Sequence, residues 1–237
     1  ILATNLGFPR IGSHRELKTA LESYWSGNSS ADELLKTAAS LRARHWFLQQ
    51  KAGIDHIPSN DFSLYDQMLD TIALLGAVPS RYGHRGGPVS LGLYFAMARG
   101  CQDAPAMEMT KWFDTNYHYI VPELASDTPF ALSTTKAVEE YKEARYLGIA
   151  TRPVLIGPVT FLKLAKMSDG SDRWNLLSKL LPIYAEVIQA QAIAGAEWVQ
   201  IDEPILVTDL DDSTRAALVE VYKVLGALPV KILLATY

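Results

Sequence analysis

One pattern recurs along this 237-residue chain and constrains its fold more than any other feature. A segment of helical character ends at a glycine, and a short apolar run that ends in polar residues follows the glycine. The pattern occurs in Lys51–Asp61, Tyr146–Thr160 and Ile193–Pro204. The apolar runs are too short for helices and are rich in Ile and Val, which is typical of strands buried on both faces of a parallel sheet. Strands that alternate with helices in this way predict an α/β fold.

Polar residues gather after the predicted strands, as they do in a (β/α)8 barrel, where sites lie at the carboxyl ends of the strands. A closed barrel typically takes ~250 residues, and the predicted strands are too few to close one. We therefore predict a TIM-barrel type α/β fold that is incomplete at the C-terminus, with residues 1–237 forming part of one barrel domain of a longer polypeptide. The strands that we expect are Leu2–Gly7, Ile54–Pro58, Tyr117–Val121, Pro153–Ile156, Trp198–Ile201 and Lys231–Thr236.

Two helix starts carry the capping-box pattern, in which a Ser side chain caps the helix and a Glu three residues later bonds back to it. These are Ser13 with Glu16 and Ser30 with Glu33. The remaining helices are expected at Leu64–Leu75, Val89–Arg99, Thr134–Leu147, Arg173–Ala194 and Ser213–Leu225.

The composition excludes several classes of protein. The 22 Lys and Arg residues against 26 Asp and Glu give a net charge of −4, which disfavours nucleic-acid binding. Cys101 is the one cysteine and no two histidines stand at metal-ligand spacing, so we expect neither a disulfide nor a metal site, and we identify no catalytic residue. No signal peptide and no apolar run of ~18 residues is visible, so we expect a cytoplasmic protein without a membrane partner.

Three groups of polar residues could form a site. Arg15 and Lys18 lie at a predicted helix start, where anions are favoured, although the spacing alone modestly favours a solvated basic face paired with Glu16 and Glu22. Lys111, Asn116 and His118 alternate with aromatic residues, as in the wall of a pocket or in a core strand with a satisfied histidine.

The third group is Asp202 with Glu203, at the carboxyl end of a predicted strand. Acids at a barrel mouth can serve as a base, a hydroxyl acceptor or a metal ligand. The alternative is a cap followed by the proline stop at Pro204. An adjacent Asp-Glu pair is unfavourable at the end of a buried run unless it is hydrogen-bonded, which favours a functional interpretation.

Six segments together resemble a known family. LGFPRIG, RELKTALESYW, LRARHW, EMTKWFDTNYHYIVPE, RPVLIGPVT and EWVQIDEP occur in this order. They are similar to the amino-terminal half of cobalamin-independent methionine synthase (5-methyltetrahydropteroyltriglutamate–homocysteine S-methyltransferase), and the resemblance extends from Leu2 to Tyr237. The family has two (β/α)8 barrels and transfers the N5-methyl of 5-methyltetrahydropteroyltri-L-glutamate to L-homocysteine in methionine biosynthesis.

The resemblance implies that this part binds the folate polyglutamate tail through Arg15, Glu16, Leu17, Lys18 and Lys111. It places zinc and L-homocysteine on the second, catalytic barrel, which is absent here, and it implies no cobalamin. These residues would then hold no metal and be inactive alone, and the whole protein would be a monomer. Asn116, His118, Asp202 and Glu203 remain candidates at the barrel mouth, with the last two interpreted as structural relics.

Two other functions stay open. The chain could be a self-sufficient, non-catalytic folate-binding or scaffold domain. It could also be a barrel enzyme of the uroporphyrinogen decarboxylase type, which would need a complete barrel and its own catalytic acid within one chain.

Overall fold

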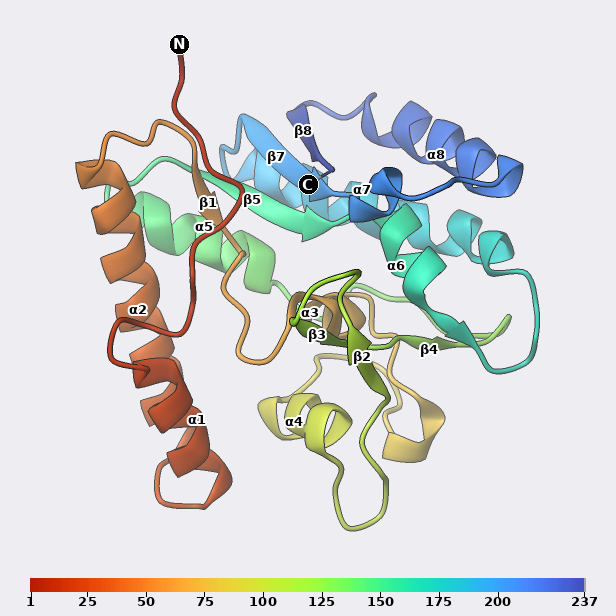
Figure 1. Ribbon diagram of the computed structural model, residues 1–237, viewed down its shortest axis with the longest axis horizontal. Helices are drawn as coiled ribbons and strands as arrows, with labels where there is room; N and C mark the ends of the chain where they lie inside the picture. The colour runs from red at the N-terminus through yellow and green to blue at the C-terminus, as the bar shows by residue number, and fades with distance from the viewer. Residues whose placement is uncertain (237) are drawn as a thin grey trace.

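The computed structural model describes residues 1–236, and its centre is a parallel sheet of four strands (Figure 1). The strands are β1 (Ile57–Ser59), β5 (Thr151–Ile156), β7 (Trp198–Asp202) and β8 (Lys231–Ala235), in the order β1-β5-β7-β8. Leu155 of β5 is opposite Ile201 of β7, which in turn is opposite Leu234 of β8. The parallel pairing of β5 with β7 confirms the α/β prediction.

The described part of the chain contains eight α-helices. The helix α5 packs against β5, and α7 contacts both α5 and α8 (Figure 1). None of these helices has the length and apolar character needed to cross a membrane. They are α1 (Glu16–Trp25), α2 (Ala31–Lys51), α3 (Gln67–Leu74), α4 (Leu91–Arg99), α5 (Lys136–Tyr146), α6 (Pro158–Leu164), α7 (Leu177–Ile193) and α8 (Asp212–Leu225), with 3-10 turns at Ser80–Tyr82, Arg173–Leu176 and Pro204–Val207.

The barrel prediction is met in part. Within residues 1–236 the sheet runs from β1 to β8 without a pairing that joins its two ends, so barrel closure stays a prediction. The segment Leu2–Gly7, expected as a strand, makes one isolated parallel bridge, from Thr4 to His56. It lies beside β1 but lacks the regular ladder of a strand.

The expected strand Tyr117–Val121 is wrong in extent and in partner. The strand β3 (His118–Ile120) pairs antiparallel with β2 (Met109–Lys111), outside the parallel sheet. Its burial explains the difference, because His118 is exposed while Tyr119 and Ile120 are buried, as in a hairpin that lies on a core. A further short parallel pair joins β4 (Glu123–Leu124) to β6 (Lys166–Met167).

One of the two capping boxes is confirmed. The Ser30 hydroxyl accepts the Glu33 N–H, and the Glu33 carboxylate accepts the Ser30 N–H at 2.7 Å. The Ser13 box is wrong, because α1 begins at Glu16 and Arg15 occupies the N-cap in the left-handed region (φ 60°). The Glu16 carboxylate instead accepts the His14 N–H at 2.9 Å.

A buried arginine ties the N-terminal segment to the sheet. Arg152, on β5, is 1% exposed. Its guanidinium donates to the Thr4 hydroxyl at 2.7 Å, to the Asn5 carbonyl oxygen at 2.7 Å and to the Gln200 side-chain oxygen at 2.5 and 3.1 Å. Gln200 in turn donates to the Leu6 carbonyl oxygen at 3.0 Å. The N-terminal segment is therefore held by side chains of β5 and β7.

We expect Arg152→Leu to lower the free energy of unfolding by about 3 kcal/mol or more, because it leaves several buried acceptors without a donor. Urea denaturation measures this loss. Limited proteolysis should also show earlier cleavage near residues 2–8. Arg85→Ala, at an exposed loop position, is the control and should change neither property. Equal stability of the Arg152→Leu variant and the wild type would contradict the anchoring role.

Candidate functional site

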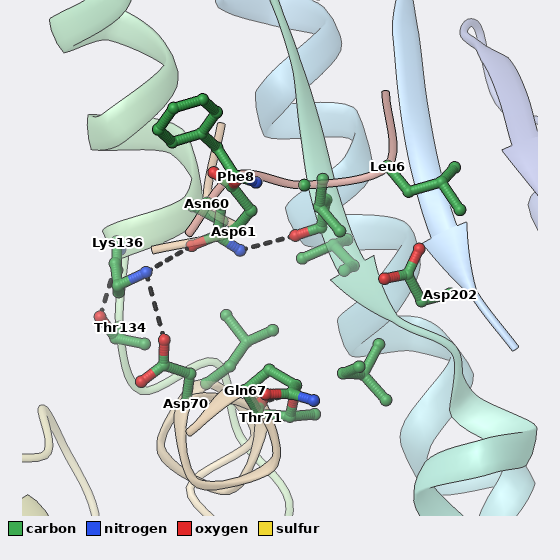
Figure 2. Close-up of a pocket in the computed structure, with 16 residues that line it drawn as sticks. Leu6, Phe8, Asn60, Asp61, Gln67, Asp70, Thr71, Thr134, Lys136 and Asp202 are labelled. Atoms are coloured by element: carbon green, nitrogen blue, oxygen red, sulfur yellow. Dashed lines mark hydrogen bonds and ion pairs between the residues drawn. The ribbon is translucent and has the colours of Figure 1, made fainter. Parts of the chain in front are cut away.

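A cavity of about 240 Å³ lies at the carboxyl ends of β1, β5 and β7 (Figure 2). This is where α/β barrels place their sites. The residues Leu6 to Phe8 form one side of it. Polar groups from four further parts of the chain line it, together with apolar side chains of β5: they are Asn60, Asp61, Gln67, Asp70, Thr71, Thr134, Lys136 and Asp202.

Asp61 follows β1 and faces the N-terminal segment. Its Oδ2 accepts the Phe8 N–H at 2.8 Å. Burial raises the pKa of Asp61 to about 6, and the hydrogen bond from Phe8 opposes the rise. The preceding residue, Asn60, adopts φ 60°, a conformation that Asn tolerates better than most residues. The turn after β1 is thus shaped to bring Asp61 to the cavity.

Lys136 supplies the cation of the cavity. Its ammonium lies 2.8 Å from the Asn60 side-chain oxygen and 3.2 Å from the Asp70 carboxylate (Figure 2). It also lies 3.1 Å from the Glu140 carboxylate. These three acceptors match the three hydrogens of the ammonium group. Sequence reasoning missed Lys136 and Asp70, since they meet only because α3 and α5 both pack against β5.

The two acids after β7 have different environments. Glu203 is fully buried, and its carboxylate accepts the Val159 N–H at 3.1 Å and the Thr160 N–H at 2.6 Å, at the start of α6. A side chain at Gly157 would collide with this carboxylate, so glycine is required there. Burial raises the pKa of Glu203 to about 7. Glu203 therefore has a structural role, linking the end of β7 to α6.

Asp202 faces the cavity, on the side away from Lys136 (Figure 2). It accepts a hydrogen bond from the Gln200 side chain at 2.6 Å, so the group that binds Arg152 also orients this carboxylate. Asn116 and His118 lie elsewhere. They belong to the exposed β2–β3 hairpin, where the His118 ring meets the Asn116 carbonyl oxygen at 3.1 Å, and they are not among the residues that line the cavity.

The residues expected at the polyglutamate tail occupy two segments. Arg15 and Lys18 are exposed at the start of α1, and Lys18 pairs loosely with Glu22 at 3.7 Å. Glu16 pairs with Arg44 at 2.7 Å, and Leu17 is fully buried in the core. Lys111 is exposed at the end of β2, opposite His118. No hydrogen bond or ion pair within residues 1–236 joins Lys111 directly to Arg15 or Lys18.

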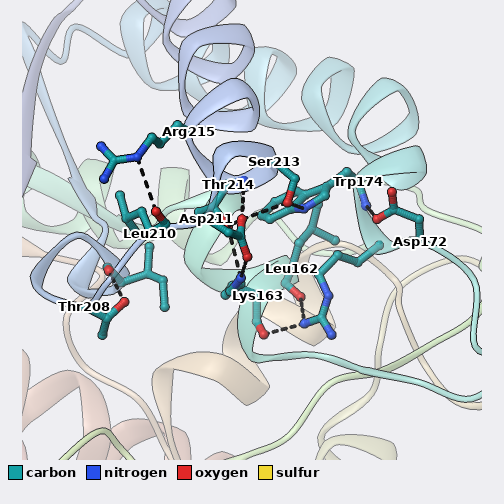
Figure 3. Close-up of polar contacts among 12 residues, drawn as sticks. Leu162, Lys163, Asp172, Trp174, Thr208, Leu210, Asp211, Ser213, Thr214 and Arg215 are labelled. Atoms are coloured by element: carbon teal, nitrogen blue, oxygen red, sulfur yellow. Dashed lines mark hydrogen bonds and ion pairs between the residues drawn. The ribbon is translucent and has the colours of Figure 1, made fainter.

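A second polar cluster fixes α8 against α6 (Figure 3). Asp211 caps α8 through the Thr214 N–H at 2.7 Å and binds the Lys163 ammonium at 2.7 Å. The Trp174 indole N–H donates to the Ser213 hydroxyl at 3.1 Å. These contacts fix the position of α6. The N–H groups at the start of this helix donate to Glu203. In the described part of the chain no group of three His, Cys, Asp or Glu side chains is placed to hold a metal ion.

Comparison with known proteins identifies relatives over the whole chain. Residues 2–237 match the family model of the cobalamin-independent synthase N-terminal domain. A protein of Salinibacter ruber is 55% identical over 99% of this chain and 32% of its own length, and one of Nitrosomonas europaea is 54% identical over 100% and 31%. Both are named 5-methyltetrahydropteroyltriglutamate–homocysteine methyltransferase. The chain spans about a third of the length of these relatives.

Two solved structures share the fold at low sequence identity. A B12-independent methionine synthase from Shewanella sp. superposes with a TM-score of 0.60 at 19% identity, over 87% of this chain and 53% of that chain. A putative vitamin-B12 independent methionine synthase from Listeria monocytogenes gives a TM-score of 0.59 at 14% identity, over 98% and 62%. The α/β arrangement described above is thus found in these proteins also.

The raised pKa of Glu203 predicts a pH dependence of stability. The folded state binds this proton more tightly than the unfolded state, so the contribution is complete below pH ~4.5 and is lost as the pH rises to about 7. In Glu203→Gln, the decline of the unfolding free energy between pH 5 and 7 should be shallower by up to ~1.4 kcal/mol per pH unit. Chemical denaturation at several pH values measures it.

Asp209→Asn is the control for this experiment, since Asp209 is an exposed carboxylate in the loop that follows. It should retain the wild-type slope. The same slope in Glu203→Gln as in the wild type would show that Glu203 does not take up a proton in this range.

Proposed function

This chain belongs to the cobalamin-independent synthase family, as its N-terminal domain, and we propose that it binds the polyglutamate tail of 5-methyltetrahydropteroyltri-L-glutamate. In the whole protein the N5-methyl of that folate passes to L-homocysteine and forms L-methionine. In this proposal zinc and L-homocysteine belong to the second barrel, as the resemblance to the family implies. The whole protein acts as a cytoplasmic monomer, and it uses no cobalamin.

One observation carries this proposal: exposed cations stand on two segments with strained backbone. Among residues 1–236 three non-glycine residues have positive φ, and two of them are Arg15 (φ 60°) and Phe113 (φ 49°), the latter two residues after Lys111. Strained backbone of this kind concentrates at functional sites, where the surrounding structure holds it. The third, Asn60, lies in the cavity.

The four residues at the start of α1 divide into two roles. Leu17 anchors the helix in the core, and Glu16 is neutralised by Arg44, so its charge does not oppose an anionic ligand. Arg15 and Lys18 remain exposed. Lys18 can exchange its pairing with Glu22 for a ligand carboxylate at little cost, because an exposed pair of this kind contributes ~1 kcal/mol or less.

The ligand chemistry follows from these cations. Each glutamate of the tail adds a carboxylate, and opposite charges ~4 Å apart attract by about 1 kcal/mol in water and about 4 kcal/mol near a partly desolvated surface. Cations on two separate segments suit a flexible chain that carries several carboxylates. The uroporphyrinogen decarboxylase alternative is set aside, since residues 2–237 match a different family.

Lys18→Ala and Lys111→Ala should each weaken binding of the triglutamate substrate more than binding of the monoglutamate substrate. The expected loss for the triglutamate is about 1 kcal/mol, because both side chains are exposed. It should shrink as salt rises, since exposed charges are screened within ~8–10 Å at physiological ionic strength. Titration calorimetry with both folates, at two salt concentrations and on the intact protein, measures these effects.

Lys142→Ala is the matched control, because Lys142 is an exposed lysine on α5 that pairs with Glu139. It should leave both affinities unchanged. Equal losses for the triglutamate and monoglutamate in Lys18→Ala and Lys111→Ala would mean that these lysines do not bind the tail. The solvated basic face would then be the better interpretation.

The 237 residues alone should transfer no methyl group from the triglutamate folate to L-homocysteine, and should bind no stoichiometric zinc. A coupled assay of methionine formation and elemental analysis of the purified chain test this. The intact protein serves as the positive control. Turnover by the isolated chain, with contaminating full-length enzyme excluded by mass spectrometry, would refute the proposal that catalysis belongs to the second barrel.

A further inference from the structure

A second cavity, of about 350 Å³, is lined by the helices α2, α3, α4 and α5. The residues that we propose to bind the tail are not among those that line it. Asp70, Thr134 and Lys136 line both this cavity and the one at the strand ends, so the two cavities share a wall. Most of the remaining wall is apolar, with Leu35, Ala38, Phe62, Leu64, Ala73 and Leu91.

One side of this cavity carries a group of ionised side chains. Arg42 of α2 lies 2.7 Å from the Glu143 carboxylate and 3.5 Å from the Glu140 carboxylate. Lys136 lies 3.1 Å from the Glu140 carboxylate and 3.2 Å from the Asp70 carboxylate. All five of these side chains line the cavity. Three carboxylates therefore share two cations, which leaves the group with one negative charge in excess.

Glu140 is the most buried of the three carboxylates. It is 5% exposed, and Oε1 makes its ion pairs with Arg42 and Lys136. Its Oε2 has no hydrogen-bond partner among the described residues. Burial raises the pKa of Glu140, and the charges of Lys136 and Arg42 oppose that rise. A buried carboxylate oxygen without a donor is unfavourable, because nothing offsets its loss of hydration. The wall of the cavity thus contains an acceptor that lacks a donor.

These features select the class of ligand. Small-molecule sites have volumes of about 300–1,000 Å³ and are mostly apolar, with a few placed polar groups. A water or an alcohol could donate to Oε2 of Glu140 but would leave the excess charge in place. An anion would be repelled by that charge. An ammonium group supplies both a donor and the missing positive charge.

We propose that this cavity binds a small primary ammonium ion with an apolar body. The ammonium group donates to Oε2 of Glu140, and the hydrocarbon part packs against apolar side chains such as Leu64 and Leu91. The site is separate from the tail-binding segments, so its test does not depend on the tail proposal.

The test uses n-hexylammonium as the probe, with n-hexanol and hexanoate as neutral and anionic analogues of the same length. Titration calorimetry on the intact protein measures their affinities. The ammonium should bind about tenfold or more tightly than the alcohol, which is the effect of a hydrogen bond between charged groups. Hexanoate should bind more weakly than either.

Glu140→Gln is the decisive variant. Its side-chain oxygen can still accept from Lys136 and Arg42, while an NH2 group replaces Oε2 and the negative charge is lost. The affinity for n-hexylammonium should fall about tenfold or more, and the affinity for n-hexanol should stay unchanged. Glu220→Gln is the matched control, because Glu220 is an exposed glutamate of α8, and it should leave both affinities unchanged.

Three results would overturn the proposal. The first is that n-hexylammonium does not bind, or binds no better than n-hexanol or hexanoate. The second is an unchanged affinity for n-hexylammonium in Glu140→Gln, which would place the amine elsewhere. The third is retained binding in Ala73→Leu, since the larger side chain enters the cavity and should abolish binding of both probes. If thermal unfolding shows that Ala73→Leu does not fold, Glu140→Gln still decides, because glutamine has the shape of glutamate.

Discussion

The buried guanidinium of Arg152 is the interaction on which the rest of the site depends. Among the described residues the N-terminal segment makes one isolated bridge, to His56 just before β1, and side chains of the sheet hold the rest of its backbone. Arg152 bonds to Thr4, Asn5 and Gln200, and Gln200 bonds to both Leu6 and Asp202. The same network therefore sets one wall of the cavity and the orientation of the acid that faces it. Burial lowers the pKa of Arg152, and the negative charges of Asp202 and Asp61 act in the opposite direction. The charges of these three residues are therefore interdependent.

The acids near the strand ends share a location but not a role. The Glu203 carboxylate accepts N–H groups at the start of α6, and the Asp61 carboxylate accepts the Phe8 N–H. Asp70 forms an ion pair with Lys136. These assignments follow from burial, because a buried carboxylate is tolerated only where donors reach it. The adjacency of Asp202 and Glu203 in the sequence suggests one functional unit, yet successive residues after a strand point in different directions. Only Asp202 of this pair lines the cavity.

Much of the fold was predictable from the glycine-and-apolar-run pattern. It located β1, β5 and β7, and their parallel pairing follows from runs buried on both faces. The misassigned segments share a cause. The antiparallel partner of His118–Ile120 depends on the loop geometry around Phe113, and the start of α1 depends on Arg15 taking a left-handed conformation. Neither is visible in hydrophobic periodicity. Lys136 and Asp70 were missed because their contact joins residues distant in the sequence, which no local motif records.

A tail-binding surface on this domain would combine rigid supports with exposed charges. A polyglutamate chain is flexible, and ordering both it and the protein side chains opposes binding. Cations whose backbone is already held reduce that cost on the side of the protein. Three buried or paired groups supply such support without contacting the ligand. Leu17 packs in the core, Glu16 forms an ion pair with Arg44, and the Asp66 carboxylate accepts the Ile120 N–H of β3. The residues that determine the preference for a long tail are then expected to include buried and neutralised side chains beneath the surface as well as the lysines upon it.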